Sequence, residues 1–484
     1  MRKYVWPLFL LPKRNCAHFM FYVSQKKYEM DGCADAIIID ASNGGNLSLE
    51  ELSDVLSKLL SGAHNDEVEV GIHFYNSWSY QLPLLRGIDS AIPRYSFPAI
   101  KKMLVRAGFV HQRIYSHYPD ERRVVDVTPS GHKTVFNQEG TVRERLKIRI
   151  LQNHFLRYFQ PAYIVVASKS YGTHNNVIDS IVHHENFGSL YHLFLGSTNI
   201  LIAVFKHVIV HVPMNVISIA RCKQNKRILL ELKKTKFGSY TPLFINESSV
   251  NNQIYFCESK MPGASSNLSS MPAHKIDLIT NNALRFITEF HKDSLKDMVV
   301  NENNFKRQFS RNFKRIEIHL NKEYATKLAG IAENLKKRLN NKNMKSVWMH
   351  GDYKIENILF DTKNWNIDGV IDWDMSRREG VPLVDLLCIL LCKAERQSGQ
   401  SMESIYRQRY VHLKFTPEEM KIIVCYLETL GISIELLLPL TLAYWIEAAA
   451  KHIVYTADDG THHTHEWMHK RVYCVIDEIM KVLM

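Results

Sequence analysis

Apolar and polar residues along the first third of the chain predict a sheet of strands that alternate with helices. Apolar or alternating runs predict strands at 34–40, 68–76, 110–118 and 161–169. Apolar side chains at helical spacing predict helices at 47–60 and 96–109. The run at 110–118 alternates in the manner of an exposed or edge strand. Strands that alternate with helices are typical of an α/β sheet.

A second pattern begins after residue 170. Runs of β-branched and aromatic residues predict strands at 190–196, 199–205 and 207–213. A helix is predicted at 217–234, and further strands follow up to 255–263. From about residue 274 onward the pattern is predominantly helical, with basic, solvated faces. We therefore expect a small β-rich part followed by a larger helical part.

The residues with the clearest chemistry surround two short predicted strands, 358–360 and 369–371. Asp352 and Asn357 precede the first strand, and Asp372 follows the second. Because a polar turn joins the strands, we expect a hairpin that brings these three side chains together. Two carboxylates and an amide carbonyl suit Mg²⁺, which prefers hard oxygen ligands. A free carboxylate beside that metal can orient a hydroxyl group for phosphoryl transfer and accept its proton.

Three motifs in this window resemble one enzyme family. HGDYKIEN (350–357), IDWD (371–374) and GVPLVDLL (380–387) are similar to the aminoglycoside phosphotransferase and choline kinase family, relatives of the protein kinases. The resemblance implies a bilobal protein-kinase-like domain with a β-rich small lobe and a helical large lobe. It also implies ATP (or GTP) and Mg²⁺ as cofactors, and a hydroxyl group of a small molecule as the phosphate acceptor.

The resemblance assigns roles to four residues of the catalytic window. Asp352 would be the catalytic base, and Lys354 would lie near the transferred phosphate. Asn357 would be a Mg²⁺ ligand and Asp372 the principal one. Two further acidic residues would support these groups: Asp385 by anchoring the catalytic loop, and Asp374 from behind the metal ligands.

The predicted small lobe departs from the family pattern at its phosphate-binding cation. A lobe of this kind has a lysine on its third strand and a glutamate on the following helix that pairs with it. The matching strand position here is His211, and the helix offers Glu231, although the first choice by pattern is Asn225. A neutral or half-protonated imidazole is a weaker phosphate ligand than an ammonium group. Two readings therefore stay open: an active phosphotransferase, or a nucleotide-binding pseudokinase or scaffold.

Two further segments of the small lobe are assigned to the nucleotide by analogy. FLGST (194–198) would place Gly196 and Ser197 near the phosphates. YFCESKMPG (255–263) resembles the family's hinge, where backbone groups from Glu258 to Lys260 would meet the adenine.

The first part of the chain resembles the C-terminal part of a class I methyltransferase domain that binds S-adenosylmethionine. The likeness rests on DAIIID (35–40), EVEVGIHFYNSWSY (67–80), KKMLVRAGF (101–109) and PAYIVVASK (161–169). Such domains seat the cofactor on a Gly-rich loop after their first strand. Upstream of residue 34 there is neither a GxGxxG motif nor room for two strand–helix units. We therefore expect a truncated relic, because a working methyltransferase requires that loop.

Composition sets limits on the remaining possibilities. The chain has 484 residues and a formal net charge of +12, which favours anionic partners without choosing among them. Its eight cysteines form no CxxC pair, which favours reduced thiols and a cytoplasmic location. No stretch reaches the length of a membrane span, and 436–446 is interpreted as a buried helix.

The basic and histidine-rich segments are interpreted as solvated surface, without a ligand. The basic segments 221–236 and 306–315 carry no nucleic-acid motif, so we expect solvated helix faces and no nucleic-acid partner. His462, His463, His465 and His469 are expected in a solvated loop that enters the last helix.

Together these patterns predict an α/β region and an α+β region. The first is a truncated Rossmann-like, methyltransferase-like region at 1–172. The second is a bilobal protein-kinase-like domain, with its small nucleotide-binding lobe at 173–262 and its helical lobe with the catalytic loop at 263–484. The acceptor would be a sugar, an amino sugar or an amino alcohol, and the oligomeric state stays open.

Overall fold

The chain forms two compact units in the computed structural model. Unit one comprises Met1–Asn215 and Ile245–Lys260, and unit two comprises Val216–Phe244 and Met261–Met484. The structure describes the continuous ranges 199–250, 253–265, 271–458 and 468–483. Before them it describes 19–23, 36–40, 50–54, 56, 69–76, 94–117, 124–126, 162–168, 177–188, 190 and 192–196.

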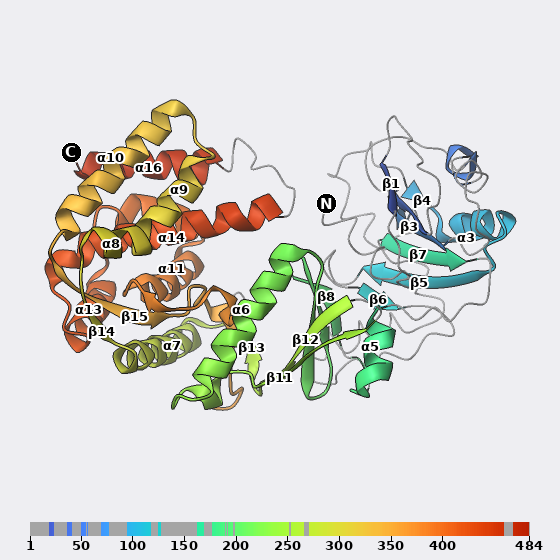
Figure 1. Ribbon diagram of the computed structural model, residues 1–484, viewed down its shortest axis with the longest axis horizontal. Helices are drawn as coiled ribbons and strands as arrows, with labels where there is room; N and C mark the ends of the chain where they lie inside the picture. Colours follow the sequence, from blue (N-terminus) through green and yellow to red (C-terminus); the bar gives the residue numbers. More distant parts are fainter. Residues whose placement is uncertain are drawn as a thin grey trace. The chain divides into compact units, whose positions relative to one another are not determined.

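Unit one contains a mixed seven-stranded sheet (Figure 1). Its strand order is β1-β2-β3-β7-β5-β6, with β4 paired to β3. The strands are β1 (Phe19–Val23), β2 (Ala36–Asp40), β3 (Glu69–Asn76), β4 (Arg94–Tyr95), β5 (His111–His117), β6 (Val124–Asp126) and β7 (Ala162–Ser168). Strands β1, β2 and β3 are parallel, whereas β7 is antiparallel to both of its neighbours, β3 and β5.

Most elements predicted for this region are found. The strands at 34–40, 68–76 and 161–169 are confirmed as β2, β3 and β7, and helix α3 (Phe97–Arg106) lies within the predicted 96–109. Residues 50–54 and 56 of the predicted helix 47–60 are helical. The strand at 110–118 is confirmed as β5, but of the two expectations for it, an exposed or an edge strand, the edge position is wrong, because β5 pairs with β7 on one side and β6 on the other. Strand β1 was not predicted.

A second, antiparallel sheet completes unit one. Its order is β11-β12-β10-β9-β8. The strands are β8 (His192–Leu195), β9 (Ile200–Val204), β10 (Val208–Pro213), β11 (Phe244–Val250) and β12 (Gln253–Ser259), and helix α5 (Val177–Glu185) precedes them. Apolar side chains from β9, β10 and β12 and from α5 form one buried cluster, as the β-branched and aromatic pattern predicted.

Unit two is mostly helical, and two small sheets lie within it (Figure 1). Strand β15 (Asn343–Met349) pairs with β14 (Lys296–Val299) and β18 (Arg377–Gly380). The predicted hairpin is confirmed as β16 (Ile358–Phe360) and β17 (Ile367–Val370), with β13 (Ala264–Ser265) at its edge. Helix α6 (Val216–Leu232) also belongs to this unit, although the sequence grouped it with the small lobe.

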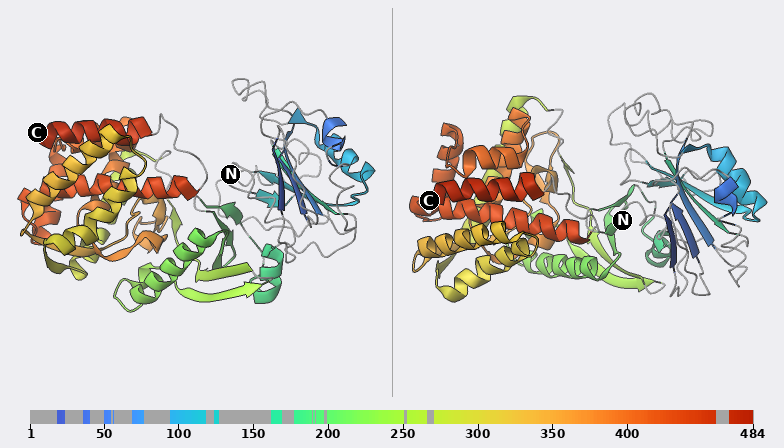
Figure 2. Two further views of the ribbon diagram at one scale, coloured as in Figure 1. Left: turned by 45° about the horizontal axis from the view of Figure 1, so that its top comes forward. Right: turned by 90° about the horizontal axis from the view of Figure 1, so that it is seen from above.

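The remaining helices of unit two enclose a single large apolar core. They are α7 (Ala273–Asp293), α8 (Glu302–Phe305), α9 (Arg311–Glu317), α10 (Lys322–Leu339), α11 (Val384–Ser398), α12 (Met402–Ile405), α13 (Pro417–Thr429), α14 (Leu437–Asp458) and α16 (Cys474–Leu483). The yellow α10 and the red α16 lie along each other (Figure 2), and Tyr324 donates a hydrogen bond to Asp477 between them. Segment 436–446 is a buried helix, as predicted, because α14 contributes Leu440, Leu442 and Ile446 to the core.

No single helix among the described residues combines the length and hydropathy of a bilayer span. The segments Pro417–Thr429 and Ile434–Ile453 meet those criteria only as a pair, which is bent by 119°.

The N-terminus of α13 gives a direct test of the helical framework. Thr416 and Glu419 form a reciprocal capping box there. We expect Thr416→Ala to lower the free energy of unfolding by about 1 kcal/mol, because a helix N–H loses its partner. Thr429→Ala, at the exposed end of the same helix, should change it by less than about 0.5 kcal/mol. Equal losses in denaturant unfolding would contradict this.

Candidate active site

The candidate catalytic loop begins where β15 ends, at His350-Gly351-Asp352. Gly351 has a φ of +83°, and a Cβ atom there would lie 2.6 Å from the Met375 carbonyl oxygen. A residue with a side chain would therefore be strained and would also collide with the backbone at 375. The glycine of this motif is required by the close approach of two loops.

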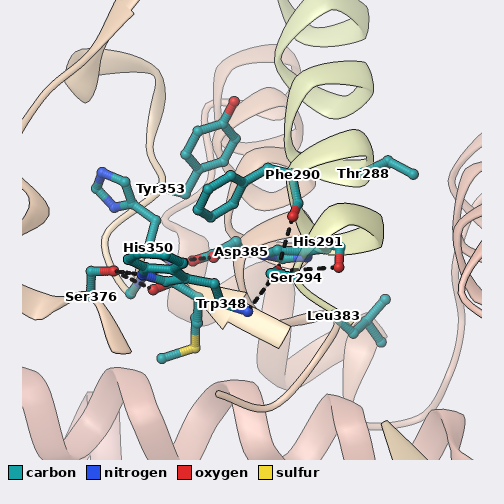
Figure 3. Close-up of polar contacts among 12 residues, drawn as sticks. Thr288, Phe290, His291, Ser294, Trp348, His350, Tyr353, Ser376, Leu383 and Asp385 are labelled. Atoms are coloured by element: carbon teal, nitrogen blue, oxygen red, sulfur yellow. Dashed lines mark hydrogen bonds and ion pairs between the residues drawn. The ribbon is translucent and has the colours of Figure 1, made fainter. Parts of the chain in front are cut away.

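A buried carboxylate holds this loop in place (Figure 3). Asp385, near the start of α11, accepts hydrogen bonds from the backbone N–H groups of His350 at 2.7 Å and Gly351 at 2.9 Å. Its side chain is only 1% exposed. Asp385 thus anchors the catalytic loop, as predicted.

Two residues from other helices support Asp385 in turn. His291 of α7 lies 3.2 Å from Asp385 through Nε2 and 2.7 Å from the Tyr426 hydroxyl through Nδ1. The backbone N–H of Leu383 donates to the same hydroxyl at 3.1 Å. These contacts form one satisfied chain if Tyr426 donates to Nδ1 and Nε2–H donates to Asp385. Burial would raise the pKa of Asp385, but its hydrogen bond to His291 and the adjacent histidines and backbone donors hold it below its usual value.

His350 fixes the path of the loop from inside. Its Nδ1 accepts a hydrogen bond from the Asp352 backbone at 3.2 Å, and its Nε2 lies 3.1 Å from the Ile371 carbonyl. Complete burial lowers the pKa of His350, so the ring is neutral and both contacts are satisfied by one tautomer. The ring also packs against Trp373, with 4.4 Å between centroids. His350 therefore joins the loop of Asp352 to the segment that carries Asp372.

Asp352 lies between two lysines. Lys354 is 3.4 Å from its Oδ2 atom, and Lys451 of α14 forms an ion pair with its Oδ1 atom. Burial alone would raise the pKa of Asp352, but these two cations outweigh it and hold the pKa below its ordinary value. Asp352 is therefore an ionised carboxylate whose side chain is 10% exposed.

Lys451 was missed by the sequence reasoning. It follows three alanines in a largely apolar helix, and a single lysine there was the only available signal. It is separated from the catalytic motif by about 100 residues, so no local pattern connects the two.

Asn357 and Asp372 flank the open end of the hairpin, opposite its turn. The backbone N–H of Ile371 donates to the Asn357 carbonyl at 2.9 Å, and the Asn357 amide nitrogen bonds to Asp352. Asp372 has φ 66° and ψ 58°, a left-handed conformation that costs about 1–3 kcal/mol for a residue other than glycine. Strain of this kind is frequent at ligand-binding positions.

The oxygen atoms of these two residues fit a hard cation. Over the described ranges, neither the exposed Asp372 carboxylate nor the Asn357 Oδ1 atom has a hydrogen bond or an ion pair. No group of three or more His, Cys, Asp and Glu side chains in those ranges could hold a metal ion by itself. Mg²⁺ typically takes one or two carboxylates and completes its shell with water and phosphate oxygens. The donor set therefore suits Mg²⁺ bound together with a nucleotide.

The candidate nucleotide residues of unit one lie on the antiparallel sheet. His211 on β10 and Glu258 on β12 form a contact of 3.0 Å between Nε2 and Oε1, and both side chains are largely buried. The Gly196 backbone N–H, in the turn after β8, donates to the Ile200 carbonyl at 2.8 Å, and Ser197 lies outside the described residues. The Lys260 backbone N–H donates to the His207 carbonyl at 2.9 Å. The structure thus brings His211 and Glu258 together.

The cysteine and histidine interpretations fall partly within the described chain. Cys388 and Cys392 share helix α11 as free thiols. His462, His463 and His465 lie outside the described residues, and His469 opens a π-helical turn.

One family model matches the part of the chain that contains these residues. Residues 279–423 match the model of a phosphotransferase enzyme family. This stretch contains His291, Asp352, Asn357, Asp372 and Asp385, and the match supports a kinase-like phosphotransferase enzyme, as predicted. No curated protein matched the chain.

Three solved structures illustrate the structural similarity. The ADP-bound aminoglycoside phosphotransferase APH(2'')-Ib is 16% identical, with 64% of this chain and 96% of that chain covered and a TM-score of 0.39. APH(3'')-Id from Streptomyces rimosus, in complex with ADP and streptomycin, is 12% identical, with 57% and 96% covered and a TM-score of 0.37. The GDP and kanamycin complex of a third such enzyme, of the 2'' type, is 11% identical, with 63% and 98% covered and a TM-score of 0.40.

The support behind Asp385 can be tested by removing one hydroxyl group. We expect Tyr426→Phe to cost about 1–3 kcal/mol of stability, because the Leu383 N–H and His291 Nδ1 lose a buried partner. It should also speed hydrogen exchange at the His350 and Gly351 amides, which are bonded to Asp385.

Tyr410→Phe is the matched control, since its buried hydroxyl bonds to Glu419 away from this loop. It should cost a similar amount of stability but leave exchange at His350 and Gly351 unchanged. Equal exchange in both variants would show that Tyr426 has no role in holding the loop.

Proposed function

We propose that the protein catalyses ATP-dependent, Mg²⁺-assisted phosphoryl transfer to a hydroxyl group of a small molecule. The observation that carries the proposal is the hairpin on which Asp352, Asn357 and Asp372 converge, held by the buried Asp385. The family match over the same residues supports it.

In this mechanism Asp352 orients the acceptor hydroxyl toward the γ-phosphorus. A bond forms between the hydroxyl oxygen and phosphorus, the bond from phosphorus to the β–γ bridging oxygen breaks, and the proton passes to Asp352. Its lowered pKa makes Asp352 a weak base, so we expect positioning to dominate, with proton transfer late. Lys354 and Lys451 surround the transferring group with positive charge. Mg²⁺ held by Asn357 and Asp372 would neutralise phosphate charge.

A cavity on the helical side is the candidate acceptor pocket. It is lined by Tyr406 and Tyr444, by the ion pair of Glu403 with Arg471 at 2.8 Å, and by other residues of α14, the helix that carries Lys451. Two of its lining residues, Tyr406 and Arg471, belong to π-helical turns, which are frequent at functional sites. Aromatic faces beside a charged pair suit a polar ring compound, such as a sugar or amino sugar, or an amino alcohol. Nucleotide choice between ATP and GTP and a cytoplasmic location stay predictions.

The alternative is a nucleotide-binding pseudokinase or scaffold. The contact of His211 with Glu258 favours it, because the expected phosphate-binding position carries an imidazole already engaged by a carboxylate. Gly196, Ser197 and Lys260 would still provide backbone contacts to a nucleotide in either case.

We further propose that the first sheet is related to the C-terminal part of a class I methyltransferase domain and does not support methyl transfer. Strands β1, β2 and β3 are parallel, and β7 lies between β3 and β5 in the sheet and is antiparallel to both. This strand order supports the likeness. Binding of S-adenosylmethionine to the full chain would contradict the proposal.

Asp352→Asn tests the proposed base. With ATP, Mg²⁺ and a panel of sugar and amino-alcohol acceptors, we expect turnover to fall by about 10²–10⁴-fold while ADP binding is retained. Asp361→Asn is the matched control and should keep the turnover of the wild type. Asp361 lies on the turn of the same hairpin, and an amide oxygen can still accept the Lys363 N–H. Tight ATP binding without turnover of any acceptor by the wild type would favour the pseudokinase.

Substitutions of His211 separate the two functions at the nucleotide side. If the histidine is a weak phosphate ligand, His211→Lys should lower the KM for ATP, since an ammonium group carries a full charge beside Glu258. His211→Ala should raise that KM. Steady-state kinetics in which neither variant differs from the wild type would exclude this residue from the phosphate site.

A further inference from the structure

Helix α6 is fastened to the loop that carries the proposed metal ligand Asp372. Arg221 of α6 forms an ion pair with Asp374, and its Nε lies 2.6 Å from Oδ2. The side chains are 13% and 7% exposed, so the pair is largely removed from water. Asp374 follows Asp372 by two residues. The first turns of α6 therefore reach the metal loop through a buried, charge-assisted contact.

Two further contacts lie along the same face of α6. Gln224 donates to the Ser376 carbonyl at 3.2 Å, and Glu231 forms an ion pair with Arg378 at 2.7 Å. Positions 221, 224 and 231 fall on one side of a helix with 3.6 residues per turn. One helix face thus follows the loop from 374 to 378, and we call these three contacts the α6 clasp.

The other side of the loop is fixed by the core. Trp373 is fully buried and donates to the Val370 carbonyl at 2.7 Å, and the Ser376 hydroxyl donates to the Met349 carbonyl at 2.8 Å. Asp372, directly before Trp373, adopts its left-handed conformation. A strained residue persists only where its surroundings over-determine it. The core contacts this segment at Trp373 and Ser376, and the α6 clasp contacts it at Asp374, Ser376 and Arg378.

The clasp stands where the resemblance led us to expect a different ion pair. The expected pair joins a strand lysine to an acidic residue on this helix, but the strand residue here is His211, which contacts Glu258 in its own sheet. Helix α6 instead presents an arginine, and its partner is on the metal loop. The grouping of α6 with the catalytic unit agrees with this arrangement.

We propose that Arg221 is a positioning residue that holds Asp372 in its metal-binding geometry, so that docking of α6 and binding of a Mg²⁺–nucleotide complex are coupled. The inference rests on the proposed nucleotide site. Because coupling between two equilibria is reciprocal, a Mg²⁺–nucleotide complex must stabilise the docked helix as much as the docked helix favours the complex.

The test measures binding rather than turnover, on the full chain. Calorimetry with ADP in the presence of MgCl₂ and in the presence of EDTA gives the metal-dependent part of the affinity. We expect Arg221→Ala to weaken binding of ADP with MgCl₂ by between about fivefold and 150-fold, and to leave binding in EDTA unchanged. Arg221→Lys should restore part of the loss. Arg227→Ala, an exposed arginine on the same helix, is the matched control and should match the wild type.

The outcomes separate this inference from the proposed function. If the wild type binds no ADP even with MgCl₂, the proposed nucleotide site fails and the inference falls with it. If the wild type shows metal-dependent binding and Arg221→Ala shows the same, only the inference is overturned. If Arg221→Ala does not fold, the coupling is tested with Gln224→Ala, which should weaken binding of ADP with MgCl₂ in the same direction, and with hydrogen exchange of the wild type. ADP with MgCl₂ should then slow exchange across 216–232, and unchanged exchange would overturn the coupling.

Discussion

The position of the candidate active site depends on the carboxylate of Asp385. It is buried in the core of unit two, where an unpaired charge would be costly, and it is compensated by two backbone N–H groups and the imidazole of His291. Those backbone groups belong to His350 and Gly351, so the carboxylate fixes the turn that presents Asp352. Loss of any one donor would leave part of a buried charge unsatisfied, and the loop is therefore held in a single arrangement.

From this anchor the constraint extends to the metal ligands. His350 bonds to the backbone of Asp352 and Ile371, and Asn357 bonds to the same two segments. Asp352 is kept ionised by two lysines, whereas Asp372 has an exposed carboxylate in a strained backbone conformation. The Asp352 carboxylate is thus paired with two lysines of the chain, whereas the Asp372 carboxylate is exposed and can bind a metal cation. This division suits a site in which Asp352 orients an acceptor and Asp372 holds Mg²⁺ beside the phosphates.

Local sequence predicted the parts of this site that are local in the chain. The hairpin, the order of Asp352, Asn357 and Asp372, and the anchor Asp385 all lie within 36 residues of one another by number, and a motif with fixed spacing describes them. Lys451, His291 and Arg221 come from helices far away in the chain, and each resembles an ordinary helix residue in its own segment. Only tertiary packing brings them to the loop. The same limit explains why β5 was expected at a sheet edge. Its alternating pattern indicates one solvent-facing side, but it does not show that β6 pairs with it.

In the proposed function, the hairpin forms a metal site for a bound nucleotide. Mn²⁺ replaces Mg²⁺ at many such sites, and its electron paramagnetic resonance signal distinguishes bound from free ion. In the presence of ADP, the wild-type chain should bind Mn²⁺, Asp372→Asn should lose that binding, and Asp368→Asn, on the neighbouring strand, should retain it. Equal Mn²⁺ binding by the wild type and Asp372→Asn, or none by the wild type with ADP, would contradict the claim.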